Sequence, residues 1–116
     1  MKTRELSNNE RAIIERVAAK LPATDRDALI NEMNGATVVE ESGDGGRVVF
    51  ALQNYVRPAY LGQHSYGVEG KMRDADGTEI SVILYADENN RLLELELLRW
   101  GEGNLQAPNF GTLKFY

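Results

Sequence analysis

The stretch "RLLELELLRW", residues 91–100, decides the fold class because its side chains alternate with the period of a β-strand. One side of this strand is aliphatic and carries Leu93, Leu95 and Leu97. The other side carries two carboxylates followed by two large apolar groups: Glu94, Glu96, Leu98 and Trp100. The aliphatic side predicts a buried face, and the mixed side predicts a surface that the rest of the chain leaves uncovered.

Two segments before this strand, at about 66–74 and 78–86, have the same period and are joined to it by "DADG" and "DENN". A three-residue turn over 75–77 places Val68 and Met72 on the aliphatic side. A two- or four-residue turn would instead bury three charged side chains, those of Glu69, Lys71 and Arg73. The three-residue turn is therefore predicted. For the next hairpin we expect a four-residue turn over 87–90, which sets Leu84 opposite Leu93.

The first 35 residues have the period of helices. Ser7 and Glu10 form a capping box ahead of an apolar stripe, and Thr24 is the expected N-cap of a second helix that stops at Asn34. The period then changes to two, and "ATVVEE" and "RVVFAL" flank the glycine-rich turn "SGDGG". The sequence thus predicts one domain over residues 1–116, with a helical pair at 7–34 and an antiparallel sheet region at 36–116.

These elements predict an α+β fold in which two N-terminal helices pack on one face of an antiparallel sheet of about five strands. The segment "TLKFY" at the C-terminal end is expected to form an edge strand. Because two helices cover only one side of such a sheet, the aliphatic side receives them. The side of Glu94 and Glu96 then remains uncovered.

Composition narrows the function classes. The chain has 116 residues, 42% of them hydrophobic and 27% charged, with no cysteine and a formal net charge of −5. No segment reads as a signal peptide or a membrane span, so a cytoplasmic protein is expected. The acidic excess lies beyond the first 35 residues; it disfavours nucleic acid and favours a basic protein partner. An interpretation with equal weight is that the charge serves solubility alone.

None of the motifs that resemble a catalytic, calcium-binding or phosphate-binding site has all the residues that such a site needs. We therefore predict no catalytic residues, no cofactor and no metal. Glu94 and Glu96 lack the cleft that a carboxylate pair needs for catalysis. His64 is adjacent to Ser65, and adjacent side chains of an extended chain point apart, so a loop histidine is expected. "DADGTE" has its glycine at the wrong position for a calcium loop, and "GDGGR" lacks the ending of a phosphate loop.

The remaining candidate is a surface. By strand parity, five side chains lie on the uncovered face and form the predicted partner-binding surface: Glu79, Tyr85, Glu94, Glu96 and Trp100. Trp100 is the expected anchor, and the carboxylates are expected to steer a basic partner. A competing arrangement has residues 101–116 fold back over this face and bury Trp100. The turns and the 53–65 loop would then be the contact surface.

The chain resembles a family of small, uncharacterised bacterial proteins that share two patterns. The first, R-x-L-x-x-x-E, is formed here by Arg4, Leu6 and Glu10. The second, D-x-x-x-x-L-x-E-L-E, is formed by Asp87, Leu92, Glu94, Leu95 and Glu96. Small acidic α+β proteins of this kind also resemble the immunity proteins of bacterial toxin systems, including contact-dependent growth inhibition. That resemblance implies a non-enzymatic inhibitor that binds one basic toxin domain through an acidic, aromatic surface.

Three function classes follow. The first is a binding protein, most concretely an immunity protein that neutralises a cognate toxin by direct contact. The second is a self-associating structural or regulatory module, in which an edge strand such as "TLKFY" pairs with a second copy to form a homodimer. The third, a small enzyme, has the least support because no residue pattern provides for catalysis.

Overall fold

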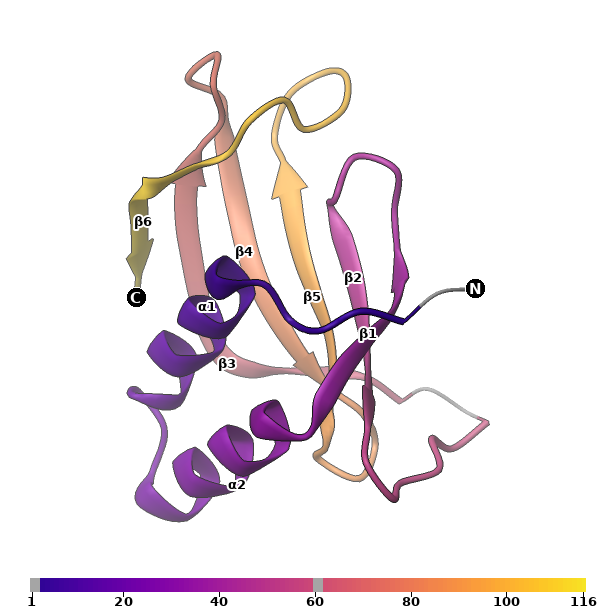
Figure 1. Cartoon of the computed structure of the whole chain (residues 1–116). Coiled ribbons are helices and arrows are strands. Elements are labelled where there is room, and N and C mark those ends of the chain that lie inside the picture. Colours follow the sequence, from indigo (N-terminus) through magenta and orange to yellow (C-terminus); the bar gives the residue numbers. More distant parts are fainter. Residues whose placement is uncertain (1–2, 60–61) are drawn as a thin grey trace.

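A six-stranded antiparallel sheet forms the body of the molecule (Figure 1). The computed structural model describes residues 3–59 and 62–116. Two helices come first, α1 (Asn8–Ala18) and α2 (Ala23–Asn34). Six strands follow: β1 (Ala36–Glu41), β2 (Arg47–Leu52), β3 (His64–Arg73), β4 (Glu79–Ala86), β5 (Leu92–Arg99) and β6 (Asn109–Phe115). Their order in the sheet is β1-β2-β5-β4-β3-β6.

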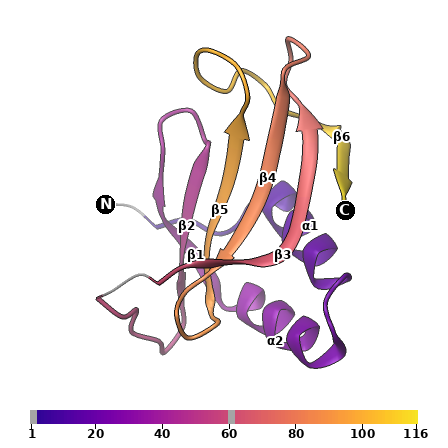
Figure 2. The ribbon, with the colours of Figure 1, turned by 180° about the vertical axis from the view of Figure 1, so that it is seen from behind.

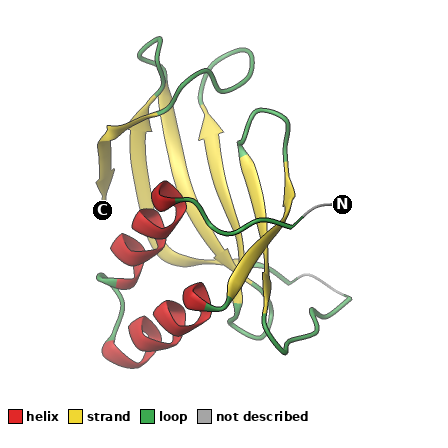
Figure 3. Ribbon diagram, viewed as in Figure 1, coloured by secondary structure: helices red, strands yellow, loops and turns green. Residues whose placement is uncertain are grey.

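Both helices lie on the same side of the sheet, and the view from behind shows the strands uncovered by them (Figures 2 and 3). The predicted α+β class is confirmed, and "TLKFY" lies largely within the edge strand β6. None of the helices in the described part of the chain is both long and apolar enough to cross a membrane.

The helix starts follow local chemistry. At α1 the predicted capping box is present: Ser7 Oγ accepts a hydrogen bond from the Glu10 backbone, and the Glu10 carboxylate accepts one from the Ser7 backbone. Arg4 adds two hydrogen bonds to the same carboxylate, at 2.9 and 2.7 Å. The prediction of Thr24 as N-cap is wrong, because the N-cap is Pro22, two residues earlier, and it makes no side-chain cap hydrogen bond.

The core lies between the helices and the sheet. α1 contributes a stripe at helical spacing and α2 a shorter one, and both meet the inward side chains of the strands. Its largest fully buried members are Phe50, Ile13, Ile14, Leu29, Met72, Ile80, Leu84 and Leu92. Burial of each such side chain contributes roughly 1.5–3 kcal/mol.

The β3–β4 hairpin has the predicted register. Glu69 pairs with Ile83, and Lys71 pairs with Ser81. The turn holds three residues, closed by the Asp74 backbone N–H donating to the Thr78 carbonyl at 2.8 Å. Gly77 has φ 87°, the left-handed conformation that this turn requires. Charge exclusion from the core was therefore sufficient to predict the register of this hairpin.

The β4–β5 hairpin differs from the prediction. The Asp87 backbone N–H donates to the Arg91 carbonyl at 2.8 Å, so this turn also has three residues, 88–90, where four were expected over 87–90. Asn90 takes the left-handed position with φ 62°. Asparagine is one of the few non-glycine residues that tolerate this conformation. A turn one residue shorter, left uncorrected, would move every later side chain of β5 to the opposite face.

A β-bulge on β5 returns its later side chains to the predicted faces of the sheet. Tyr85 pairs with Glu94 while Ala86 pairs with Leu92, so Leu93 is an extra residue on β5. The bulge and the shorter turn together move the register by two residues, an even number. Beyond the bulge, the aliphatic and charged faces of β5 are therefore those predicted.

Leu93 itself is the exception. Leu92 takes the inward position in the core, and Leu93, although buried, lines a recess on the opposite face beside Val49. Leu84 accordingly lies opposite Leu95, so the predicted pairing of Leu84 with Leu93 is wrong. The physical reason is that the turn chemistry of residues 87–91 outweighs the four-residue alternative. The β-bulge at the start of β5 then compensates for the shorter turn.

A buried aspartate starts each of the two turns. The Asp87 side chain has no solvent exposure and accepts hydrogen bonds from the Tyr55 hydroxyl, from Arg57 at 2.8 Å and from the Arg91 backbone at 3.0 Å. Burial alone would raise the pKa of Asp87, but the hydrogen bonds from Tyr55 and Arg57 hold it below its usual value. Asp87 thereby fastens the chain after β2 to the end of β4.

Asp74 has the same role at the other end of the sheet. Its carboxylate accepts hydrogen bonds from Arg99 at 2.8 Å and from the backbone of Gln106 and Ala107 at 3.0 and 2.8 Å. Burial opposes ionisation of Asp74 as well, and these donors again bring its pKa below the usual range. The segment that connects β5 to β6 is thus fastened to the β3–β4 turn.

The Asp87→Asn variant tests this account. We expect it to lower the free energy of unfolding at neutral pH by about 3 kcal/mol or more, because Arg57 then lacks its buried partner. Since the pKa of Asp87 is lowered by folding, its contribution is present above the ordinary carboxyl pKa of 3.8 and is lost as the pH falls. Urea unfolding from pH 7 down to pH 3 measures both effects.

Glu88→Gln is the matched control, because Glu88 is an exposed residue of the same turn. It should unfold like the wild type. Equal stabilities of Asp87→Asn and Glu88→Gln at pH 7 would contradict the anchoring role of Asp87.

Candidate functional site

The sheet face opposite the helices is called here the outer face. Its side chains alternate with the core residues, and the strand pairing sets them in rows across β2, β5, β4 and β3. Three rows make up its centre: Arg47, Glu96, Ile83 and Glu69; Val49, Glu94 and Tyr85; and Leu98, Ser81 and Lys71. Figure 2 shows this face from the front.

Glu94 is on the outer face but is not exposed. Only 5% of the residue contacts solvent, and its Oε1 lies 3.0 Å from Arg47 Nε. Burial raises the pKa of Glu94, the Arg47 charge partly offsets this, and the neighbouring Glu96 and Glu40 add to the rise. The expectation that Glu94 is an exposed steering charge is therefore wrong: its neighbour on β2 covers and pairs with it.

Tyr85 and Glu96 form a second polar pair. The Tyr85 hydroxyl donates to Glu96 Oε1 at 3.1 Å, and both side chains are half-buried. Burial raises the pKa of Tyr85, and the Glu96 carboxylate raises it further. The phenol thus remains a hydrogen-bond donor at neutral pH. One oxygen of Glu96 is held by this bond.

Trp100 is a large exposed aromatic group of the outer face. It is 63% exposed, yet its orientation is set because Nε1 donates to Ser81 Oγ at 2.7 Å. Its backbone N–H donates to the Glu79 carbonyl at 2.9 Å, which extends the pairing of β5 with β4 beyond the strand end. Leu98, 38% exposed, precedes it on the same side of β5. A partly fixed indole beside an exposed leucine is typical of a contact surface.

The five predicted partner-binding residues thus lie on one face but in two groups. Tyr85, Glu94 and Glu96 lie toward the end of β4 and the start of β5, and Glu79 and Trp100 are at the opposite end of this strand pair. The row of Ser81 and Leu98 lies between the groups, and the Trp100 indole reaches into it.

The segment after β5 leaves this face open. Leu105, Phe110 and Phe115 pack against the core, and the connection over residues 101–108 crosses on the helix side of the sheet before it enters β6, as Figure 1 shows. The competing arrangement, in which residues 101–116 bury Trp100, is therefore wrong. Of the 53–65 loop, residues 60 and 61 lie outside the described residues, and Tyr55 and Arg57 are held by Asp87.

Two features of the outer face were missed by reasoning from the sequence. Arg47 covers Glu94, but nothing local indicates that β2 is the neighbour of β5. A basic corner also forms where Lys71 lies directly opposite Lys114 on β6, with Arg73 on the same side of β3. The alternation of "TLKFY" contains this signal, since Leu113 and Phe115 face inward and Lys114 must then face outward. Like charges directly opposite each other on neighbouring strands are destabilising, so the pairing of Lys71 with Lys114 disfavours this part of the sheet.

Within residues 3–59 and 62–116, no group of three or more histidine, cysteine, aspartate or glutamate side chains is placed to hold a metal ion. The model of one protein family, described as Domain of unknown function (DUF6984), matches residues 3–108. The chain belongs to this family. The match spans both helices and the first five strands, and so includes all five predicted contact residues. No curated protein and no solved structure matches the chain.

Replacing Glu94 by Gln tests its burial. Because folding raises the pKa of Glu94 above 4.5, the folded state holds this proton more tightly than the unfolded chain does. The wild type should therefore lose stability relative to Glu94→Gln as the pH rises from about 4.5 through the raised value. Chemical unfolding at pH 4 and pH 7 compares the two proteins. A variant equal to the wild type at pH 4 but less stable at pH 7 would show that the Arg47 ion pair outweighs burial.

Proposed function

We propose that the chain is a non-enzymatic binding protein that acts in the cytoplasm as an immunity protein and neutralises a cognate bacterial toxin by direct contact. The observation that carries the proposal is Trp100: a large aromatic side chain, 63% exposed, oriented by a hydrogen bond and placed on the sheet face that the helices leave open. Tryptophan is enriched among the residues that dominate binding energy.

The surroundings of Trp100 support a protein partner over a small substrate. Leu98 and Tyr85 extend the apolar contact area on the same face, and Glu96 and Glu69 supply negative charge. Glu94 is paired with Arg47, and Glu79 lies 3.9 Å from Lys71, so the charges available to a basic partner are those of Glu96 and Glu69. Such charges accelerate association and make it sensitive to salt, whereas the aromatic anchor governs dissociation.

The alternative function, self-association through an edge strand, has less support because both edges carry additional bonds. Arg4 pairs with Val38 along the outer edge of β1 by two backbone hydrogen bonds, at 3.0 and 2.8 Å. On β6, Arg16 donates to the Leu113 carbonyl at 3.2 Å and lies 5.1 Å from the Phe115 ring. Covered edges resist pairing with a second copy. Sedimentation at micromolar concentration distinguishes the alternatives, because a strand-paired homodimer has twice the monomer mass.

A growth assay tests the immunity proposal. The toxin candidates are the products of the genes that flank the gene for this chain, each produced from an inducible promoter in a bacterial host. We expect growth to stop on induction and to resume when this chain is co-produced. Arrest that the chain does not relieve would contradict the proposal.

Binding to the purified toxin domain tests the surface. Trp100→Ala should weaken binding by about 2 kcal/mol or more if the indole is the anchor. Val56→Ala is the matched control, because it truncates a side chain that is 90% exposed in a different part of the chain. Trp100 is the only tryptophan, so its fluorescence reports contact directly in the wild type. Unchanged fluorescence on binding would place the contact elsewhere.

Reversing the charge of Glu96 tests whether the carboxylates of the outer face accelerate association with the toxin domain. Glu96→Lys should slow association and reduce its dependence on salt. Glu15→Lys makes the same change of charge on an exposed position of α1, on the helix side. Stopped-flow association rates at two salt concentrations compare the two variants. Equal rates would contradict the assignment of the outer face.

A further inference from the structure

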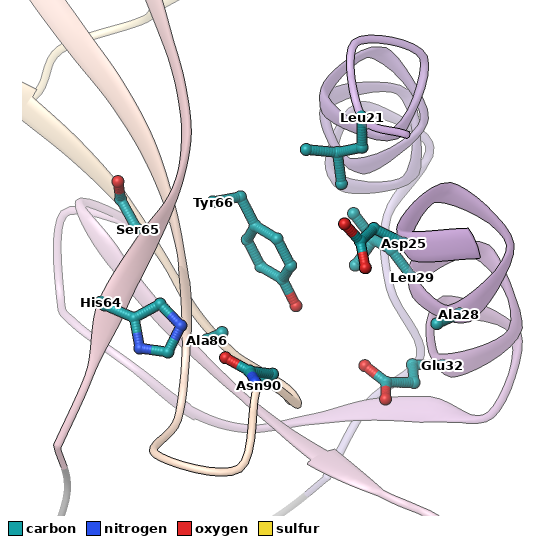
Figure 4. A pocket seen from close by; sticks show the side chains of 10 residues that line it. All are labelled: Leu21, Asp25, Ala28, Leu29, Glu32, His64, Ser65, Tyr66, Ala86 and Asn90. Atoms are coloured by element: carbon teal, nitrogen blue, oxygen red, sulfur yellow. The ribbon is translucent and has the colours of Figure 1, made fainter. Parts of the chain in front are cut away.

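A cavity opens between α2 and the end of the sheet, on the helix side and away from the outer face (Figure 4). Its volume is about 330 Å³, at the small end of the range for ligand sites. Three elements line it: the start and middle of α2, the first residues of β3, and the β4–β5 turn. It therefore lies where the turn of the bulged hairpin meets the second helix.

Tyr66 is the central residue of this cavity. Figure 4 shows its ring between β3 and α2, with the hydroxyl pointing toward the space between Asn90 and Glu32. Among the described residues, the Tyr66 hydroxyl is the one buried side-chain polar atom without a hydrogen-bond partner. Burial, followed by the Glu32 and Asp87 carboxylates, raises the pKa of Tyr66 well above its usual range, so the phenol stays protonated. A buried hydroxyl without a partner is costly, so it is a position where a ligand gains a bond.

The charged residues that line the cavity favour a ligand with a positive charge. Asp25 and Glu32 line it, and neither lysine nor arginine is among the ten lining residues. Glu32 is already engaged, because its carboxylate pairs with Arg91 and accepts from the Leu92 backbone at 2.9 Å. Asp25 is exposed and has no ion pair or hydrogen bond to its side chain from the described residues. Its charge is therefore available to a cation.

The other side of the cavity is apolar. Ala28 and Leu29 face the space from α2, Leu21 from the connection between the helices, and Ala86 from the sheet. A ligand that suits this lining has an alkyl stem for the apolar wall and a cationic head with hydrogen-bond donors for Asp25 and the Tyr66 hydroxyl. We propose that the cavity binds an alkylammonium or alkylguanidinium group, carried by a small free amine or by a lysine or arginine side chain of a protein. This inference does not depend on the proposed function, because a free cation suffices to test it.

Four probes test two questions: whether binding requires the positive charge, and whether the cation is a free molecule or a protein side chain. n-Butylguanidinium chloride represents a free cation, and n-butylurea has the same shape without the charge. A capped Gly-Arg-Gly peptide represents a protein side chain, and the capped Gly-citrulline-Gly peptide is its neutral counterpart. Titration followed by the amide NMR signals of Tyr66, Asn90 and the α2 residues should give saturable shifts with the charged probes alone. Tighter binding of the peptide would assign a partner side chain, and tighter binding of the free cation would assign a small amine.

Two variants test the residues. Asp25→Asn should weaken binding of the charged probe about threefold or more, as the loss of an exposed ion pair does. Asp27→Asn is the matched control, because Asp27 is an exposed residue of the same helix that does not line the cavity. Tyr66→Phe should weaken binding without lowering the thermal midpoint of the free protein, since the hydroxyl has no partner to lose.

The proposal is overturned if neither charged probe shifts the amide signals at millimolar concentration, or if the urea probe does so equally. Equal affinities of Asp25→Asn and Asp27→Asn would also overturn it. A lower thermal midpoint for Tyr66→Phe would show that the hydroxyl is already bonded in the free protein, which contradicts its role as a ligand contact.

Discussion

Two aspartates that lose all side-chain contact with solvent, Asp74 and Asp87, hold the irregular parts of this molecule to its sheet. Each stands immediately before a three-residue turn whose last residue, Gly77 or Asn90, has a positive φ. A buried carboxylate is tolerable only when charged and neutral donors satisfy it. The required donors come from long connections: from Tyr55 and Arg57 after β2, and from the backbone at Gln106 and Ala107 after β5.

The position of the candidate surface follows from these attachments. Because the connection after β5 is held at the β3–β4 turn, it crosses on the helix side and adds Leu105 and Phe110 to the edge of the core. The outer face therefore keeps Trp100 in contact with solvent. A three-residue turn follows Asp87 at the end of β4. The bulge at Leu93 is what lets that turn coexist with an aliphatic inner face on β5.

The two proposed sites use different physical means. On the outer face, several charges are already paired, as in the Arg47–Glu94 and Lys71–Glu79 contacts, and the exposed apolar groups are the distinctive feature. In the cavity beside α2 the apolar groups form part of the wall. Its distinctive features, among the described residues, are the Tyr66 hydroxyl, which has no hydrogen-bond partner, and the Asp25 carboxylate, which lines the same cavity without an ion pair. The first arrangement suits a broad protein contact, and the second suits a single cationic group. The family match over residues 3–108 includes the residues of both.

Much of this architecture is determined by local patterns in the sequence. The capping box at Ser7 and Glu10, the change of period after Gly35 and the three-residue turn ending at Gly77 all have local causes, namely backbone donors to satisfy and charges to keep out of the core. The alternation within β5 likewise assigns Glu96 and Trp100 to the uncovered face. The same alternation led to the wrong prediction that Glu94 is exposed. Alternation along a strand predicts which face of the sheet a side chain lies on, but it does not predict which side chains of other strands cover it.

Only the tertiary structure decided which distant segments meet. Arg47 covers Glu94 because β2 pairs with β5, a long-range choice that no local pattern carries. The buried Asp87 at the start of the β4–β5 turn is satisfied because Tyr55 and Arg57, some thirty positions earlier, donate hydrogen bonds to it. The cavity around Tyr66 exists because α2 packs beside that turn, so its charge and shape combine residues from positions 21 to 90. Sequence periodicity determines the elements and their faces, whereas the pairing of buried polar groups across the chain determines how those faces are covered.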